Sequence, residues 1–225
     1  MIAFIYTVCA VLVNFIIGMA FLSPVSLSDP FSLLSWVIQF SLVNYGISSI
    51  IFSLMSLHIK KYEYKREMNL KEIFFTTLSN LHNLALISFI GFILAYTVLF
   101  SPVYFISIAS LTIAGYQGFD AINESFKQLF WRKKYFTYTI PYVLAGILII
   151  AIFTFSLGYI LELEILNSSL LISSAVALQW LFHSIAMKRT VEEYIDWGLK
   201  VCVYCNSRVP IEAYYCSNCG NRLRG

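Results

Sequence analysis

The sequence predicts an all-α integral membrane protein, with about six transmembrane helices in a bundle and a small cysteine-rich module at the C-terminus. Of the 225 residues, 59% are hydrophobic and only 12% are charged, whereas roughly a quarter of the residues in a soluble domain carry charge. Windows of about 20 apolar residues, the length that crosses a bilayer, recur along the first part of the chain. Four of the five cysteines fall after residue 200. This composition excludes a soluble, disordered or collagen-like chain.

Six apolar windows divide residues 1–187, the predicted transmembrane domain. They cover 3–22, 31–57, a part of 73–100, 103–119, 141–161 and 165–187. Prolines stand near several boundaries, where they end a helix or occupy its first turn, and Pro141 is expected in the first turn of the fifth span. In a second interpretation the first window is a cleaved signal peptide with small residues at Gly18 and Ala20, which leaves five spans.

The basic residues support this division, because Lys and Arg concentrate in the cytoplasmic loops of membrane proteins. All 15 of them lie in alternate links: in 60–71, in 127–134 and after residue 187. The sequence therefore predicts a protein of the cell membrane with both termini in the cytoplasm and the lipid bilayer as its surroundings. The net charge of +3 is too small to favour a nucleic-acid partner.

The predicted spans hold mild polar residues and no ionisable residue in their middle, which argues against a proton-coupled carrier. Asn, Gln and Ser side chains at such positions usually form hydrogen bonds between helices, and the alternative is that they line a solute path. His58, His82 and His183 map to the cytoplasmic ends of three spans. Interfacial histidines explain this placement, and a shared metal or proton site is the alternative.

Two cytoplasmic segments show helical signals. Residues 120–138 place Ile122, Phe126, Leu129 and Phe130 on one face, which is typical of an amphipathic helix at the membrane surface; a charged loop is the other interpretation. After the sixth span, the capping-box pattern from Thr190 to Glu193 predicts a separate connecting helix within residues 188–200.

The last 25 residues, 201–225, carry the strongest chemical signal. Two CxxC motifs, Cys202 with Cys205 and Cys216 with Cys219, are separated by ten residues that can fold back as a hairpin. The four thiolates then meet as a tetrahedral site, for which Zn²⁺ is the best fit and iron is chemically possible. A reducing cytoplasm argues against disulfides. Cys9 is expected to be a small apolar residue of the first span.

The segment CVYCNSRVPIEAYYCSNCGNRL resembles the short zinc-ribbon module found at the ends of many bacterial and archaeal proteins. Both CxxC pairs, Val209-Pro210, Tyr215 and the glycine after the fourth cysteine carry the resemblance. The common proline after the first cysteine and glycine after the second are missing. The resemblance implies a structural zinc ribbon without catalysis, whose usual role is contact with a protein or occasionally with nucleic acid.

These observations favour a non-enzymatic multi-pass membrane protein whose ribbon docks a cytoplasmic protein partner or steadies an assembly. A closed set of four cysteine ligands supports this view, since a catalytic zinc keeps one position open. Two alternatives stay open. One is a channel or permease for a neutral or weakly polar solute, with the ribbon as a regulatory module. The other is a membrane enzyme, which requires His82 and His183 to converge.

Overall fold

The computed structural model describes residues 2–22, 30–63, 69–95, 98–159, 165–197, 199–210, 213–216 and 218–223. Most of these residues are helical. The elements in chain order are α1 (Ile2–Leu22), α2 (Pro30–Glu63), α3 (Leu70–Ser79), α4 (Leu81–Ala95), the 3₁₀ turn η1 (Val98–Phe100), α5 (Ser101–Ala109), the π-helical turn η2 (Ser110–Ala114), α6 (Gly118–Trp131), α7 (Lys134–Tyr159), α8 (Ile165–Trp197), β1 (Leu199–Val201) and β2 (Arg208–Pro210).

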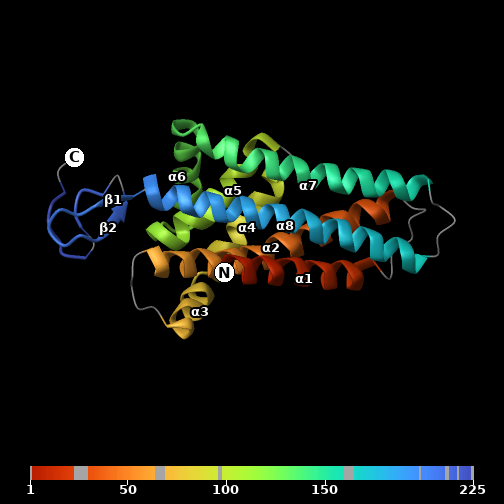
Figure 1. The fold of residues 1–225 in the computed structure, drawn as a ribbon, viewed down its shortest axis with the longest axis horizontal. Helices are drawn as coiled ribbons and strands as arrows, with labels where there is room; N and C mark the ends of the chain where they lie inside the picture. The colour runs from red at the N-terminus through yellow and green to blue at the C-terminus, as the bar shows by residue number, and fades with distance from the viewer. Residues whose placement is uncertain are drawn as a thin grey trace.

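The helices form an elongated bundle that carries the small two-stranded module at one end (Figure 1). The long helices α1, α2, α7 and α8 run along the bundle, and α8 packs against both α1 and α7. The shorter helices α4, α5 and α6 lie toward the end that carries β1 and β2, whereas the long helices extend farther toward the opposite end (Figure 1). The buried core therefore includes the short helices, and α5 is buried along its whole length.

Among the described residues, two helices are long and apolar enough to cross a membrane, Ala3–Ala20 within α1 and Ile38–Lys61 within α2. The pair α3 and α4 makes a third candidate if the two are one span. The prediction of about six transmembrane helices is thus not confirmed. The fourth predicted span, 103–119, needs correction, because its helix covers Ser101–Ala114 and ends at Gly115, whose φ of 81° is left-handed.

The third predicted span is broken. Helices α3 and α4 meet at an angle of 65° around Asn80. The backbone N–H of Asn80 donates to the carbonyl of Thr77, and its side-chain amide donates to the carbonyl of Thr76 over 2.8 Å. Both bonds satisfy carbonyl groups that a helix end leaves free. The polar residues at the start of the apolar window therefore end one helix and allow the next to begin in a new direction.

Close contacts between the long helices depend on small and polar side chains. Asn14 of α1 donates to Ser48 Oγ of α2 over 3.2 Å. A Cβ atom on Gly18 of α1 would lie 2.8 Å from Ser173 Oγ of α8, so the two helices touch where neither carries a large side chain. Hydrogen bonds and close packing of this kind hold membrane helices together.

The amphipathic segment predicted over residues 120–138 is divided between two helices. Helix α6 ends at Trp131, and its residues Ile122 and Leu129 are buried against the protein. The aromatic ring of Phe130 is 67% exposed, so it does not share the buried face as predicted. Helix α7 begins at Lys134, which places Pro141 inside the helix and corrects the expectation of a first-turn proline. Buried Tyr135 and Thr139 extend α7 ahead of this proline by packing into the core.

Helix α8 runs without a break from Ile165 to Trp197, through the segment for which the sequence predicts a separate connecting helix. Thr190 is buried within it and donates from Oγ1 to the carbonyl of Ala186 over 2.9 Å, one turn earlier. A threonine that makes this bond is part of a continuing helix and does not cap a new one. Strand β1 follows two residues after α8 and contacts it.

Candidate metal centre

The C-terminal module consists of a short hairpin and two turns of the same shape. Strands β1 and β2 pair antiparallel, with Lys200 opposite Val209. In the first turn, the N–H of Cys202 donates to the carbonyl of Ser207 and the N–H of Asn206 donates to the carbonyl of Cys202. The second turn repeats both bonds, from Cys216 to Asn221 and from Gly220 to Cys216, over 2.8 Å each. Each CxxC motif is thus folded by its own backbone.

Each turn ends on a residue with a left-handed backbone. Asn206 has φ 57° and Gly220 has φ 71°. Glycine adopts this conformation without strain, and asparagine tolerates it better than most other residues. Both residues directly follow the second cysteine of a CxxC motif, and their left-handed backbone allows each motif to form its turn.

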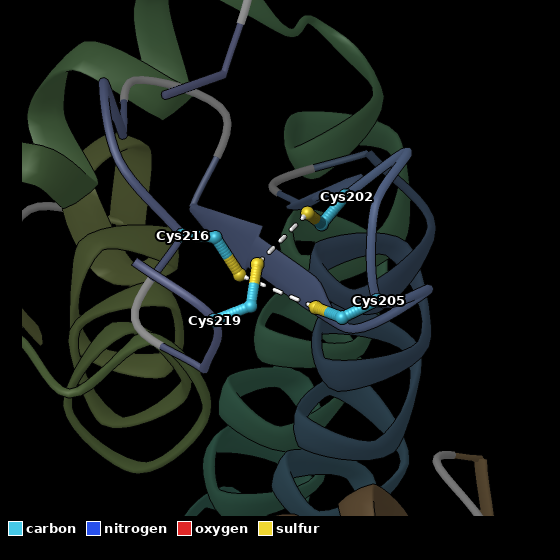
Figure 2. A group of neighbouring side chains, drawn as sticks. All are labelled: Cys202, Cys205, Cys216 and Cys219. Atoms are coloured by element: carbon cyan, nitrogen blue, oxygen red, sulfur yellow. Dashed lines mark hydrogen bonds between the residues drawn. The ribbon is translucent and has the colours of Figure 1, made fainter. Parts of the chain in front are cut away.

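The four cysteine sulfur atoms converge between the two turns (Figure 2), all within 4.8 Å of one another. Cys202 Sγ lies 3.7 Å from Cys219 Sγ, and Cys205 Sγ lies 3.5 Å from Cys216 Sγ. These separations are far longer than a disulfide bond of about 2.05 Å. A tetrahedral zinc ion with Zn–S distances near 2.3 Å requires sulfur atoms about 3.8 Å apart. The four cysteines predicted from the sequence are therefore positioned to bind a metal ion, and none forms a disulfide.

Ser207 donates hydrogen bonds that favour the ionised form of two of the four cysteines, Cys205 and Cys216. Ser207 Oγ lies 2.8 Å from Cys205 Sγ and 3.2 Å from Cys216 Sγ. The hydroxyl and the backbone amide of Ser207 lower the pKa of the Cys205 thiol to about 6, and the same hydroxyl lowers the pKa of Cys216. Asn221 Nδ2 donates to Cys219 Sγ over 3.6 Å. The hydrogen bonds from Asn221 favour the thiolate, but desolvation and the three neighbouring thiols outweigh them and raise the pKa of Cys219 to about 11. Metal ions bind thiolates, so the lowered pKa values prepare Cys205 and Cys216 for a cation, while Cys219 must lose its proton when the cation binds.

The sequence analysis missed the role of Ser207 and Asn221. Each stands two residues after the second cysteine of its motif, so the matching positions were a signal available in the sequence.

The module has little hydrophobic core of its own. Its buried cluster consists of Cys202, Cys216, Val209 and Leu223, with Cys205 and Ala213 packed against it. Two buried aliphatic side chains contribute roughly 1.5–3 kcal/mol each, whereas structural zinc contributes on the order of 10 kcal/mol. The cysteines thus form part of the core as well as the candidate binding site, and a metal ion bound to them would supply most of the stability of the module.

The three histidines lie in separate environments. His58 Nδ1 is 3.0 Å from the hydroxyl of Tyr6, and His82 is exposed on α4. His183 is buried, with its ring tilted by 43° against that of Trp180 and its Nδ1 at 2.9 Å from the carbonyl of Gln179. Within the described part of the chain, the four cysteines are the only group of three or more His, Cys, Asp or Glu side chains close enough to hold a metal ion.

No protein-family model, curated protein or solved structure matches this chain. The similarity of the C-terminal segment to zinc ribbons thus rests on its cysteine spacing and on the converging sulfur atoms.

Proposed function

We propose that this chain is a multi-pass protein of the cell membrane, with both termini in the cytoplasm, and that its C-terminal zinc ribbon docks a cytoplasmic protein partner. The observation that carries the proposal is the closed set of four converging cysteines. Four thiolates fill the coordination sphere of a zinc ion and leave no position for a substrate. A site of this kind organises the chain around it and performs no chemistry of its own.

Helix lengths and charge support the membrane placement. Helices α7 and α8 contain 26 and 33 residues, about 39 and 50 Å of helix, so they are long enough to cross a bilayer core of roughly 30 Å together with α1 and α2. The links expected outside the cell carry no Lys or Arg. We expect an impermeant maleimide added to intact cells to label Ser26→Cys and to spare Lys61→Cys. Labelling of the Lys61→Cys protein from outside would contradict the topology.

Metal content tests the zinc site directly. The Cys216→Ser substitution removes one of four ligands, so we expect about one zinc per wild-type chain and little in this variant. Cys9→Ser makes the same substitution in α1, away from the ribbon, and should retain the metal. Elemental analysis of the three purified proteins distinguishes the outcomes. Iron in place of zinc, or equal metal in the Cys216→Ser protein, would overturn the assignment.

The surface of the ribbon supports a docking role. Its exposed side chains include one valine and three tyrosines: Val203 is 84% exposed, Tyr204 61%, Tyr214 75% and Tyr215 63%. A depression of about 320 Å³ lies beside two of them and is lined by Lys200, Val201, Val203, Tyr204 and Leu223. Tyrosine is enriched at protein interfaces because its ring buries a large area and its hydroxyl tolerates water. The arrangement suits a protein partner better than open solvent.

A charge placed on this surface tests docking apart from folding. Val203→Asp adds a carboxylate to the exposed apolar surface, while Asn206→Asp adds the same charge on the same turn with little change in shape. Crosslinking in cells, followed by purification of the full-length protein, should yield one defined partner with wild type and with Asn206→Asp. We expect Val203→Asp and Cys216→Ser to lose that partner. Equal recovery with all four proteins would exclude the ribbon as the docking surface.

The interior polar residues favour this scaffold role over a permease. Asn14 bonds to Ser48, and Ser49 bonds to Ser88 and Tyr104, so these groups join helices to one another. The placement of the histidines argues against a membrane enzyme, which would require His82 and His183 to converge. His183 is enclosed by aromatic rings, while His82 is exposed at the start of α4.

A further inference from the structure

Helices α4 and α5 are each too short to cross a membrane. Helix α4 has 15 residues and Ser101–Ala114 has 14, which correspond to about 22 and 21 Å of helix. A bilayer core is roughly 30 Å thick. Helix α4 ends at Ala95, the turn η1 stands directly before α5, and both helices lie toward the ribbon end of the bundle (Figure 1).

Contacts with α2 show how deep this pair lies relative to the candidate span of α2. Tyr104 of α5 and Ser88 of α4 both bond to Ser49, at 2.9 and 2.6 Å, near the middle of the candidate span Ile38–Lys61. Beyond Ser88, α4 continues for seven residues, about 10 Å, whereas α2 continues from Ser49 for eleven residues, about 16 Å, before it reaches Ile38. The turn between α4 and α5 thus lies past the middle of the span and short of its far end.

The returning end of the pair is fixed at the cytoplasmic side. Lys60 Nζ donates to the carbonyls of Thr112 and Ile113 over 3.3 and 2.8 Å, at the end of η2. A helix leaves its last carbonyls without partners, and a cation there is favourable. Lys60 stands at the end of the candidate span of α2 that leads into a basic link. The chain therefore leaves the membrane on the side where α2 also leaves it.

Other helices surround most of this pair, as a bilayer requires of backbone that does not span it. Non-spanning backbone persists at membrane depth only where protein surrounds it. Every residue from Ser101 to Ile113 is buried, and α5 contacts α2, α4, α6, α7 and α8. The turn η1 reads Val98-Leu99-Phe100, packs against α4 and α7, and exposes 56% of the apolar Leu99 side chain. An apolar tip of this kind suits lipid and not water.

From these observations we infer that α4 and α5 form a re-entrant hairpin, which enters the membrane from the cytoplasmic side, turns at Val98–Phe100 inside the bilayer and returns to the cytoplasm. The inference rests on the proposed membrane topology and replaces two of its six predicted crossings. The positive-inside pattern is the same for both arrangements, because a hairpin and two crossings both return the chain to the cytoplasm. The basic residues alone therefore did not distinguish them.

Cysteine accessibility in the full-length protein tests the hairpin. We compare Leu99→Cys at the tip with Ser26→Cys, expected outside, and Lys61→Cys, expected inside, using an impermeant maleimide on intact and then on permeabilised cells. Labelling is compared with that of the wild-type protein, whose five native cysteines set the background. The hairpin predicts no labelling of Leu99→Cys above this background under either condition, and one additional label after denaturation in detergent. Labelling of Leu99→Cys from either side of the membrane before denaturation would overturn the hairpin.

The controls separate this result from the proposed topology. If Lys61→Cys is labelled from outside, the topology has failed, whereas labelling of Leu99→Cys and Ser26→Cys alone from outside overturns only the hairpin. A second pair of variants does not depend on reagent access. Leu99→Lys should lower the yield of folded protein, because a lysine inside the bilayer is costly, while Ser26→Lys should not. Equal yields would place Leu99 in water and contradict the inference.

Discussion

Gly91 of α4 allows α4 and α5 to pack closely, and replacing it with alanine tests this contact. A Cβ atom at position 91 would overlap the ring of Tyr104, which is buried and tied by its hydroxyl to Ser49 and to the carbonyl of Tyr45. The ring cannot turn away without breaking these bonds. Overpacking of a tight interior costs about 1–3 kcal/mol. We therefore expect Gly91→Ala to destabilise the folded protein.

Gly46 of α2 provides a matched control, since an added Cβ there meets nothing within 4 Å. Both substitutions place alanine in a helix interior, where it gains about 1 kcal/mol of helix propensity over glycine. That gain cancels in the comparison, so the difference between the two variants isolates the steric cost at Tyr104.

Thermal unfolding in one detergent, followed by circular dichroism, measures this difference. Gly91→Ala should unfold at a lower temperature than wild type or Gly46→Ala. If both alanine variants shift the transition equally, the close approach of α4 and α5 does not hold in solution and the reasoning fails.

Two further predictions concern the metal centre and the end of η2. Ser207→Ala removes a hydrogen bond that lowers the pKa of Cys205, so protons compete better for the thiolate. As the solution is acidified, this variant should release its zinc at a higher pH than wild type, which a zinc-binding dye detects. Ser207→Thr keeps the hydroxyl and should behave as wild type. Lys60→Met removes the donor to the carbonyls of Thr112 and Ile113 and should lower the free energy of unfolding by about 1.5–3 kcal/mol. Lys61→Met should lower it by less. Equal decreases in the two variants would show that the capping bonds contribute nothing.

The cysteine site could be predicted from the sequence because its determinants are local. Two residues between paired cysteines fix each turn, and ten residues between the pairs allow only a short return. The cytoplasmic placement expected from the basic residues also argued against disulfides between these cysteines. The contribution of Ser207 was harder to predict, since its only signal in the sequence is a position, two residues after Cys205, that Asn221 shares in the second motif.

Hydropathy alone does not fix the number of crossings, because it does not distinguish a helix buried in protein from one that faces lipid. Residues 101–113 are as apolar as a span, yet every one of them is covered by other helices. Thr190 shows a similar limit for local signals. Its capping-box pattern is real, but the residues before it remain helical because buried Ala186 and Met187 pack into the core. Tertiary packing decides both cases.

The continuity of α8 sets the angular position of the ribbon. A helix turns by 100° at each residue, so the number of residues between the bundle and β1 determines which way the ribbon faces. Glu193, whose Oε1 lies 4.0 Å from Arg132 Nη1, and Tyr194, which accepts a hydrogen bond from Ser110 at 3.1 Å, hold this part of α8 at a fixed rotation. One residue inserted after Tyr194 would leave the metal centre intact but rotate it by about 100°, so a partner bound to both the membrane surface and the ribbon would no longer meet both at once.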